Sequence, residues 1–174
     1  MYFPLFIDLS EKEILVIGAG HIASRRVRSL CGFAGHITVV APRISDEYPA
    51  QKRFLSTEDR SGRDDGENSS APEESEDPDT GTKITTVIRC FKESDLDGKD
   101  LVLAATDDRD LNRKVFDLCR ARGIPVNVCS DSGLCDFQFP SVVESGAVVV
   151  GINASGRDHH LVKETRKRVE TLLF

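Results

Sequence analysis

Short apolar runs alternate with helical patterns along most of this chain. Runs typical of strands occupy residues 14–17, 36–40, 84–88, 99–105 and 124–128. Between them, apolar residues recur at helical spacing in two places, first at Ile22, Val27 and Leu30 and later at Leu111, Val115, Leu118 and Cys119. Thr106 or Asp107 is expected to cap the later helix, and Gly123 to end it. This alternation predicts an α/β fold with a doubly wound, parallel sheet.

The pattern changes near residue 129. Two apolar runs, 137–143 and 147–152, flank a turn at Ser145-Gly146 and predict a β-hairpin. The last segment, 158–173, has the spacing of an amphipathic helix. Since a hairpin and one helix are too small to fold alone, we expect them to pack on the first domain or on a second copy of the chain. The predicted domains are residues 1–128 and 129–174.

One segment, residues 56–82, interrupts this pattern. It holds ten acidic and two basic residues and no Val, Ile, Leu, Met or aromatic residue. The rest of the chain has 21 basic and 19 acidic residues, so the net charge of −6 comes from this segment. Such a composition buries too little apolar surface to offset the entropy of ordering. We therefore predict a disordered acidic loop between two strands.

Composition excludes several classes of protein. No apolar run approaches the roughly 18 residues of a membrane span, and the N-terminus lacks the basic region of a secretory signal. The five cysteines are odd in number and lack the C-x-x-C spacing of a structural zinc site. We expect a cytoplasmic protein with reduced cysteines, no metal site, and neither a membrane nor a nucleic acid as partner.

A glycine turn follows the first predicted strand. Gly18 would form the tight turn, Gly20 would let the backbone approach a pyrophosphate, and Ala23 would let the helix pack closely on the strand. The helix N-terminus then offers N–H groups and the positive end of its dipole to the phosphates. Strand, turn and helix in this order predict the dinucleotide site of a Rossmann fold, with the end of the second strand near the adenosine ribose.

Several short stretches, taken in order, match one family. They are Phe3-Pro4-Leu5-Phe6, residues 16–23 with Arg25-Arg26, Val39-Val40-Ala41-Pro42, Ala104-Ala105-Thr106-Asp107-Asp108, Asn127-Val128, and residues 134–137 running to Pro140. In these stretches the chain resembles the precorrin-2 dehydrogenases and the N-terminal module of siroheme synthase. The resemblance implies oxidation of precorrin-2 to sirohydrochlorin with NAD+, which some members follow with Fe2+ insertion. It also implies a homodimer formed through the hairpin and last helix, with the tetrapyrrole bound beside the nicotinamide.

The resemblance also implies cofactor contacts. These involve His21 and Ile22 in the glycine turn and Pro42 and Arg43 after the second strand. Thr106, after the fourth strand, is a further candidate for cofactor binding. A fold that prefers NAD usually has an acidic residue after the second strand, where this chain has Ala41-Pro42-Arg43. Arg43 would suit a 2′-phosphate. We expect NAD, with NADP as the alternative.

The residues after the fifth strand depart from the family pattern. Members commonly read Asn-Val-x-Asp-Asp-Pro, and the first aspartate is credited with oxidation and chelation, whereas this chain has Ser130-Asp131-Ser132. Serine cannot act as a carboxylate base and is a poor Fe2+ ligand. Three interpretations remain: Asp131 takes the role, water accepts the proton, or the enzyme is impaired. Asp131 can equally be an Asx-turn residue. We expect weak or absent ferrochelatase activity.

Basic residues near the predicted cleft are candidates to bind the carboxylates of a tetrapyrrole. They are Arg25, Arg26, Arg28, Arg157, His159, His160 and Lys163. The main alternative function is a non-enzymatic, dinucleotide-sensing regulatory module, which needs no catalytic residue. An inactive dimer partner is a third hypothesis.

Overall fold

The computed structural model describes residues 3–45, 71–156 and 158–173. Its main sheet has six strands in the order β3-β4-β2-β1-β5-β6, and all pairs are parallel except β3 with β4. The strands are β1 (Glu13–Ile17), β2 (His36–Ala41), β3 (Glu73–Glu76), β4 (Lys83–Ile88), β5 (Leu101–Ala104) and β6 (Val126–Val128). All five strands predicted from apolar runs are present, and β5 and β6 are shorter than predicted.

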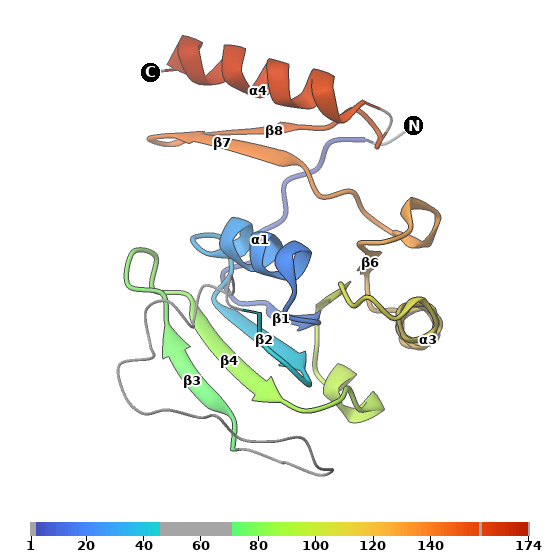
Figure 1. Ribbon diagram of the computed structural model, residues 1–174. Coiled ribbons are helices and arrows are strands. Elements are labelled where there is room, and N and C mark those ends of the chain that lie inside the picture. Colours follow the sequence, from blue (N-terminus) through green and yellow to red (C-terminus); the bar gives the residue numbers. More distant parts are fainter. Residues whose placement is uncertain (1–2, 46–70, 157, 174) are drawn as a thin grey trace.

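Two helices cover opposite faces of this sheet (Figure 1). α1 (His21–Leu30) packs Ala23 and Val27 against Ile14 and Val16 of the central strand β1. α3 (Arg109–Arg122) packs against the other face, where alternate β1 residues point, and it ends at Gly123 with a left-handed φ of 70°. Short 3₁₀ helices, η1 (Glu93–Leu96) and η2 (Ser132–Leu134), lie in the connections. The prediction of a doubly wound α/β sheet is confirmed.

The acidic segment contributes a strand that the sequence pattern did not predict. β3 pairs antiparallel with β4, and the hydroxyl of Ser75 donates to the carbonyl of Ile84 at 3.2 Å. Thr82 is buried, and its hydroxyl donates to the carbonyl of Ala34 at 2.9 Å. A polar strand at a sheet edge can form because backbone hydrogen bonds suffice to hold it there. The prediction of disorder is therefore wrong for residues 73–82, and residues 56–70 lie outside the described residues.

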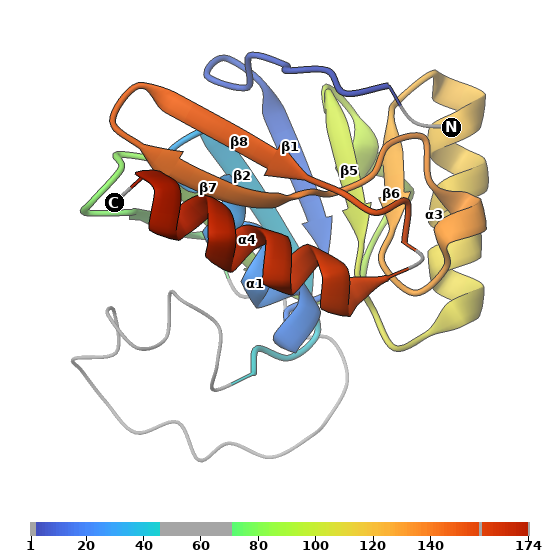
Figure 2. The same ribbon diagram turned by 90° about the horizontal axis from the view of Figure 1, so that it is seen from above.

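The C-terminal part forms a separate layer. β7 (Ser141–Ser145) and β8 (Val148–Ile152) make the predicted hairpin, and α4 (His159–Leu173) packs on β7. Figures 1 and 2 show this hairpin beyond α1, with α4 on its far side and the N-terminal segment running beside it. β7 begins later than predicted because Phe137 and Phe139 pack against the core beneath α1. The division of the chain at residue 128 stays a prediction.

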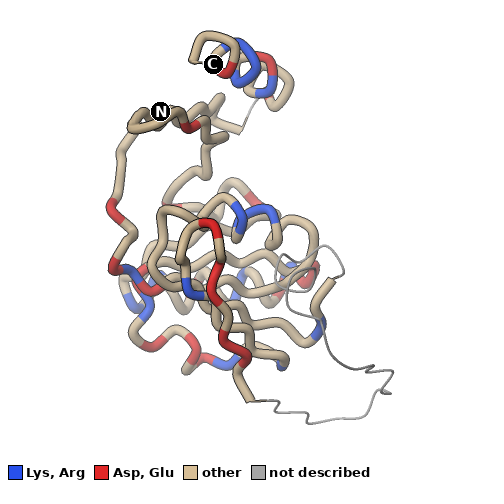
Figure 3. The backbone as a smooth tube through the Cα atoms, turned by 90° about the vertical axis from the view of Figure 1, so that its left-hand side faces the viewer, with Lys and Arg blue, Asp and Glu red and all other residues tan. Residues whose placement is uncertain are grey.

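Charged residues are unevenly placed along the backbone (Figure 3). Acidic residues follow β3 and the turn after it, α1 carries Arg25, Arg26 and Arg28, and α4 carries the Lys and Arg residues described in the C-terminal layer. Among the described helices, none has the length and apolar character needed to cross a bilayer. All five cysteines are free thiols. Within the described ranges, no three His, Cys, Asp or Glu side chains are grouped to hold a metal ion.

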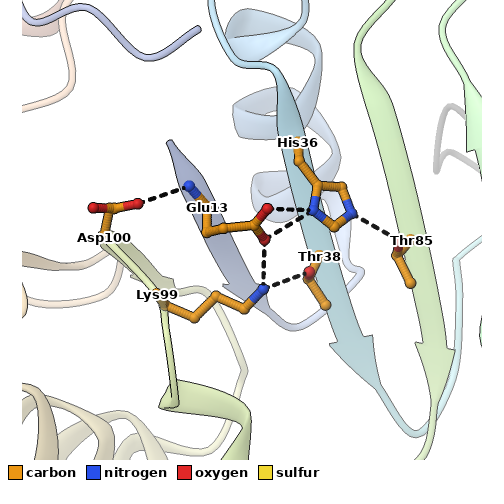
Figure 4. Close-up of polar contacts among 6 residues, drawn as sticks. All are labelled: Glu13, His36, Thr38, Thr85, Lys99 and Asp100. Carbon is orange, nitrogen blue, oxygen red and sulfur yellow. Dashed lines mark hydrogen bonds and ion pairs between the residues drawn. The ribbon is translucent and has the colours of Figure 1, made fainter. Parts of the chain in front are cut away.

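The amino-terminal end of the sheet carries a closed polar network (Figure 4). One carboxylate oxygen of Glu13 lies 2.8 Å from both His36 Nδ1 and Lys99 Nζ. His36 Nε2 lies 2.8 Å from the hydroxyl of Thr85, and Lys99 Nζ also donates to the hydroxyl of Thr38 at 3.0 Å. Each polar side chain in this network therefore has a partner on a neighbouring strand or in the loop before β5.

The neighbouring side chains of this network lower the pKa of Glu13. Partial burial favours the neutral carboxyl and works to raise its pKa, but hydrogen bonds from Lys99 and His36 outweigh burial, so the pKa is lowered. Asp100 extends the network by accepting the backbone N–H of Glu13 at 2.9 Å, and this bond also lowers the pKa of Asp100. This end of the sheet is thus held by paired carboxylates that remain ionised at neutral pH.

Candidate dinucleotide site

The turn after β1 requires glycine at its first position. Gly18 has a φ of +107°, and its N–H donates to the carbonyl of Val40 at 2.9 Å. A Cβ added there would lie 2.5 Å from the carbonyl oxygen of Ala105. Both the backbone conformation and the close approach of the loop after β5 therefore exclude a side chain. This is the tight turn that the sequence predicted.

Gly20 has the opposite requirement, because it leaves room for a ligand. It is the N-cap of α1, and a Cβ added to it would meet no protein atom within 4 Å. Because Gly20 has no side chain, no side-chain cap covers the first N–H groups of α1, which can then bind an anion. His21 begins the helix, Ile22 is 48% exposed, and Ala23 is fully buried against the sheet as predicted.

The loop after β2 reaches back to the glycine turn. Pro42 and Arg43 are exposed at the end of the strand, where the resemblance places the adenosine ribose. Two residues on, the N–H of Ser45 donates to the carbonyl of Ala19 at 3.2 Å. The hydroxyl of Ser45 is buried and has no hydrogen-bond partner among the described residues. Sequence reasoning missed Ser45, because nothing in the sequence distinguishes it from an ordinary loop serine.

Thr106 lies on the opposite side of the glycine turn and is already engaged by the protein. Its hydroxyl donates to Asn112 Oδ1 at 2.7 Å, and Asn112 Nδ2 donates back to the carbonyl of Thr106 at 2.9 Å. Asn112 is 1% exposed, so this exchange fixes the loop between β5 and α3. Asn112 was not predicted, although a polar residue on the apolar face of a predicted helix is a signal of such a role.

The cap of α3 differs from the prediction. Asp108 is the N-cap, and its carboxylate accepts the N–H groups of Asp110 at 2.9 Å and Leu111 at 3.0 Å. The prediction of Thr106 or Asp107 as the cap is wrong. Thr106 is held by Asn112 instead, so the first helical turn begins later than the sequence indicated.

Ser130 joins the same network from the end of β6. Its hydroxyl accepts a hydrogen bond from Asn112 Nδ2 at 3.2 Å, so Asn112 links the loops after β5 and β6. Asp131 is exposed and caps η2, where its Oδ1 accepts the N–H of Gly133 at 2.8 Å. The Asx-turn interpretation of Asp131 is confirmed, and its second carboxylate oxygen has no hydrogen-bond partner among the described residues.

These loops meet at the carboxyl end of the sheet, where the strand order reverses between β1 and β5. Ligands of open α/β sheets bind in the crevice at this position. The glycine at position 20, the α1 N-terminus without a side-chain cap and the unpartnered hydroxyl of Ser45 all fit a dinucleotide there. The residues present can therefore hold the cofactor that the sequence predicts.

The predicted substrate-binding residues are not equivalent in the structure. Arg26 is half-buried, and Arg157 lies outside the described residues. The others are exposed: Arg25, Arg28, His159, His160 and Lys163. Of the exposed group, only the first two lie on a helix of the main domain, and the last three belong to α4.

Comparison with known proteins gives consistent results. A family model described as "Putative NAD(P)-binding" matches residues 5–141. The siroheme synthase of Psychrobacter sp. (strain PRwf-1) is 34% identical over 171 residues, which cover 98% of this chain and 30% of that protein. The siroheme synthase of Thioalkalivibrio sulfidiphilus (strain HL-EbGR7) is 33% identical over 172 residues, or 99% of this chain and 30% of that protein.

A solved structure shares the fold. The structure of "SirC, precorrin-2 dehydrogenase" aligns with a TM-score of 0.66 and 22% sequence identity, and the alignment covers 98% of this chain and 71% of that one. The chain spans about a third of the length of the siroheme synthases it matches. The resemblance found in the sequence motifs is confirmed, and the chain belongs to the NAD(P)-binding family whose model spans its Rossmann domain.

Proposed function

We propose that this chain oxidises precorrin-2 to sirohydrochlorin with NAD+ during siroheme biosynthesis. The observation that carries the proposal is the match of nearly the whole chain to siroheme synthases, at 34% identity over 98% of its residues. The fold shared with a precorrin-2 dehydrogenase supports it, as does a carboxyl end of the sheet built for a dinucleotide. A dinucleotide sensor would need the same turn but would not account for similarity to a biosynthetic enzyme over the whole chain.

The proposed cofactor site uses the residues predicted from the sequence. Gly18, Gly20, His21 and Ile22 would hold the pyrophosphate, Pro42 and Arg43 the adenosine ribose, and Thr106 the far wall of the crevice. When bound, NAD+ supplies the acceptor for the hydride removed from the substrate. The exposed guanidinium of Arg43 keeps NADP as the alternative cofactor.

The residues proposed to accept the proton differ from those of the family pattern. Ser130 carries no charge, and its hydroxyl is held by Asn112. The Asp131 carboxylate uses one oxygen in the Asx turn and presents the other to solvent, so it can accept a proton directly or through water. Because position 130 lacks a carboxylate, we propose that ferrochelatase activity is weak or absent.

Anaerobic assay of the purified protein with precorrin-2 and NAD+ tests the proposal, with sirohydrochlorin absorbance as the readout. We expect turnover by the wild type. Asp131→Asn separates the two proton routes: a loss of tenfold or more in kcat assigns the base to Asp131, and an unchanged kcat assigns it to water. NAD+ binding without turnover would favour a sensor, and the absence of both would favour an inactive partner.

The chelatase proposal has its own test. With sirohydrochlorin and Fe2+ or Co2+, the wild type should insert metal no faster than the spontaneous rate. Ser130→Asp restores the carboxylate of the family pattern and should raise insertion above that rate, whereas the isosteric control Ser130→Asn should not. Insertion by the wild type well above the spontaneous rate would contradict the proposal.

We also propose that the chain forms a homodimer through its C-terminal layer. The whole of α4 lacks a buried residue, and Leu161 and Leu172 are 52% and 84% exposed. The N-terminal segment that runs beside the hairpin exposes further apolar side chains, namely Phe3, Leu5, Phe6 and Ile7. A second copy would cover these surfaces, which isolated monomers rarely expose together.

Sedimentation should show a dimer, and Leu161→Glu should shift it to monomer; a monomeric wild type would contradict the proposal.

The proposed reaction also fits a cytoplasmic location. The five cysteines are free, as expected of a chain kept in a reducing compartment. Fractionation of cells that express the tagged chain tests this location, and recovery in the membrane or secreted fraction would contradict it.

A further inference from the structure

Arg26 differs from the other arginines of α1. It is half-buried, and its guanidinium lies over the ring of Phe139 at 4.3 Å from the ring centroid. Arg25, its neighbour in the sequence, is exposed and does not lie over any described aromatic ring. Arg28 is also exposed, and its Nε donates to the carbonyl of Ser24 at 3.4 Å. Among these three arginines, only Arg26 is contacted by a described side chain from outside α1.

The ring that orients Arg26 is itself fixed. Asn127, on β6, is 5% exposed and donates from Nδ2 to the carbonyl of Phe137 at 2.8 Å. An isolated bridge between Asn127 and Cys135 holds the same segment against the sheet, and Phe139 packs on the core beneath α1. The guanidinium of Arg26 is therefore positioned by two elements, α1 and the segment after β6.

Within the described residues, no carboxylate pairs with Arg26. By contrast, Arg89, Arg120 and Arg166 each contact a carboxylate at 2.6–2.7 Å. Arg26 instead interacts with the thiol of Cys129: burial raises the pKa of that thiol, and the positive charge of Arg26 and a hydrogen bond between the two side chains oppose the rise. A half-buried, oriented cation that lacks an anion is suited to bind an anionic ligand.

The position of Arg26 connects the two halves of the candidate site. Ile22, which is exposed beside the glycine turn, lies one helical turn before Arg26 on the same face of α1. Cys129, with which Arg26 interacts, directly precedes Ser130. Arg26 therefore lies between the predicted pyrophosphate site and the loop proposed to accept the proton.

We propose that Arg26 binds a carboxylate of the tetrapyrrole and that Phe139 is a positioning residue that holds its guanidinium plane. The ligand class is a polycarboxylate macrocycle, for which a bidentate cation beside the reaction loop supplies both attraction and orientation. This inference rests on the proposed function, because that function supplies the tetrapyrrole.

Binding of sirohydrochlorin, followed by absorbance titration of the full chain, tests the role of Arg26 without requiring turnover. We expect Arg26→Gln to weaken binding by about 10- to 100-fold, the range for loss of a charge-assisted contact. The matched control Arg25→Gln removes the same charge one residue away and should change the Kd by less than twofold. Neither variant should change the Kd for NAD+.

A double-mutant cycle tests the role of Phe139. In the wild-type background, Arg26→Lys keeps the charge but loses the planar contact, and we expect binding to weaken severalfold. In the Phe139→Leu background, the same Arg26→Lys change should have little further effect. Equal losses from Arg26→Lys in both backgrounds would show that Phe139 does not orient the guanidinium and would overturn that part of the proposal.

The outcomes separate this inference from the proposed function. Equal weakening by Arg25→Gln and Arg26→Gln would show nonspecific attraction, and an unchanged Kd for Arg26→Gln would exclude the contact; either result overturns the inference. Wild-type binding of sirohydrochlorin without oxidation of precorrin-2 would refute the proposed function alone. Absence of wild-type tetrapyrrole binding would refute both.

Discussion

The two ends of the parallel sheet use polar groups in opposite ways. At the amino-terminal end, Glu13, His36 and Lys99 satisfy one another across neighbouring elements. Among the described residues of the carboxyl end, the N-terminus of α1 has no side-chain cap, the hydroxyl of Ser45 has no hydrogen-bond partner, and Arg26 has no carboxylate partner. The same strands thus end in a closed network on one side and in unpartnered groups on the other.

This difference separates stability from binding. Buried or half-buried polar groups lower the stability of the folded state unless they are paired. We therefore expect the paired groups to stabilise the fold and the unpaired groups to bind a ligand. The carboxyl end is not uniformly unpaired, because Thr106, Asn112 and Ser130 satisfy one another there. That internal network fixes the loops after β5 and β6 beside the glycine turn.

The largest expected effect comes from Gly18→Ala. The new Cβ would lie 2.5 Å from the carbonyl of Ala105 in a backbone with a φ of +107°. We expect destabilisation of about 3 kcal/mol, or roughly 6–12 °C in Tm for a chain of this size, as in other cases of backbone strain and overpacking. Thermal unfolding followed by circular dichroism measures it, and a Tm shift below about 2 °C would contradict the geometry of the turn.

Gly20→Ala should affect binding rather than folding. Its Cβ meets no protein atom within 4 Å, and Gly20 has a φ of −78°, so the substitution causes no clash or backbone strain and should cost the fold at most about 1 kcal/mol, because Ala is a poorer N-cap than Gly. The methyl group would stand where a pyrophosphate approaches, and we expect about tenfold or weaker affinity for NAD+. Calorimetric titration measures this affinity, and an unchanged Kd would exclude the turn as the phosphate site.

Glu13→Gln tests the opposite end of the sheet. It leaves Lys99 without its carboxylate while preserving size, and we expect destabilisation of about 1 kcal/mol, limited by the partial exposure of Glu13. The Kd for NAD+ should not change. A higher Kd for NAD+ with an unchanged Tm would contradict the assignment of stability to the amino-terminal end and of binding to the carboxyl end.

The stability difference between the wild type and Glu13→Gln should depend on pH. The pKa of Glu13 is lowered from its ordinary value of 4.5, so its contribution is present above that pH and is lost as the pH falls through the lowered pKa. The difference in Tm between the wild type and Glu13→Gln should therefore be present at neutral pH and shrink below about pH 4.5. A difference that grows on acidification would contradict the pairing.

An effect as small as that of Glu13→Gln is expected at one of two neighbouring aspartates at the carboxyl end. Asp108 caps α3 and accepts two backbone N–H groups, so Asp108→Ala should cost about 1 kcal/mol. Asp107 makes no such bond, and the control Asp107→Ala should leave Tm unchanged within about 1 °C. Denaturant unfolding distinguishes the two, and equal effects would remove Asp108 as the cap.

The sequence predicted the elements whose signal is apolar and local. β1, β2, β4, α1 and α3 follow from apolar periodicity, and Gly18 and Gly20 follow from turn chemistry. β3 was missed because it contains no apolar residue and depends on pairing with β4. The N-cap was misplaced because Thr106, Asp107 and Asp108 can all cap a helix, and the contact of Thr106 with Asn112 decides among them.

The details of the site depend on contacts between distant segments. The sequence contains Arg25 and Arg26 side by side, and nothing local separates them. Their difference arises because Phe139, held by the segment after β6, lies under one guanidinium and not the other. The partner of Ser130 and the unpartnered hydroxyl of Ser45 likewise exist only once the loops have come together.

Backbone hydrogen exchange with and without saturating NAD+ tests most directly whether the cofactor binds at the carboxyl end of the sheet. We expect NAD+ to protect residues 18–23, 42–45 and 105–106 and to leave exchange unchanged near Glu13, His36 and Lys83. Protection at the amino-terminal end, or no protection of the glycine turn at saturating NAD+, would contradict it.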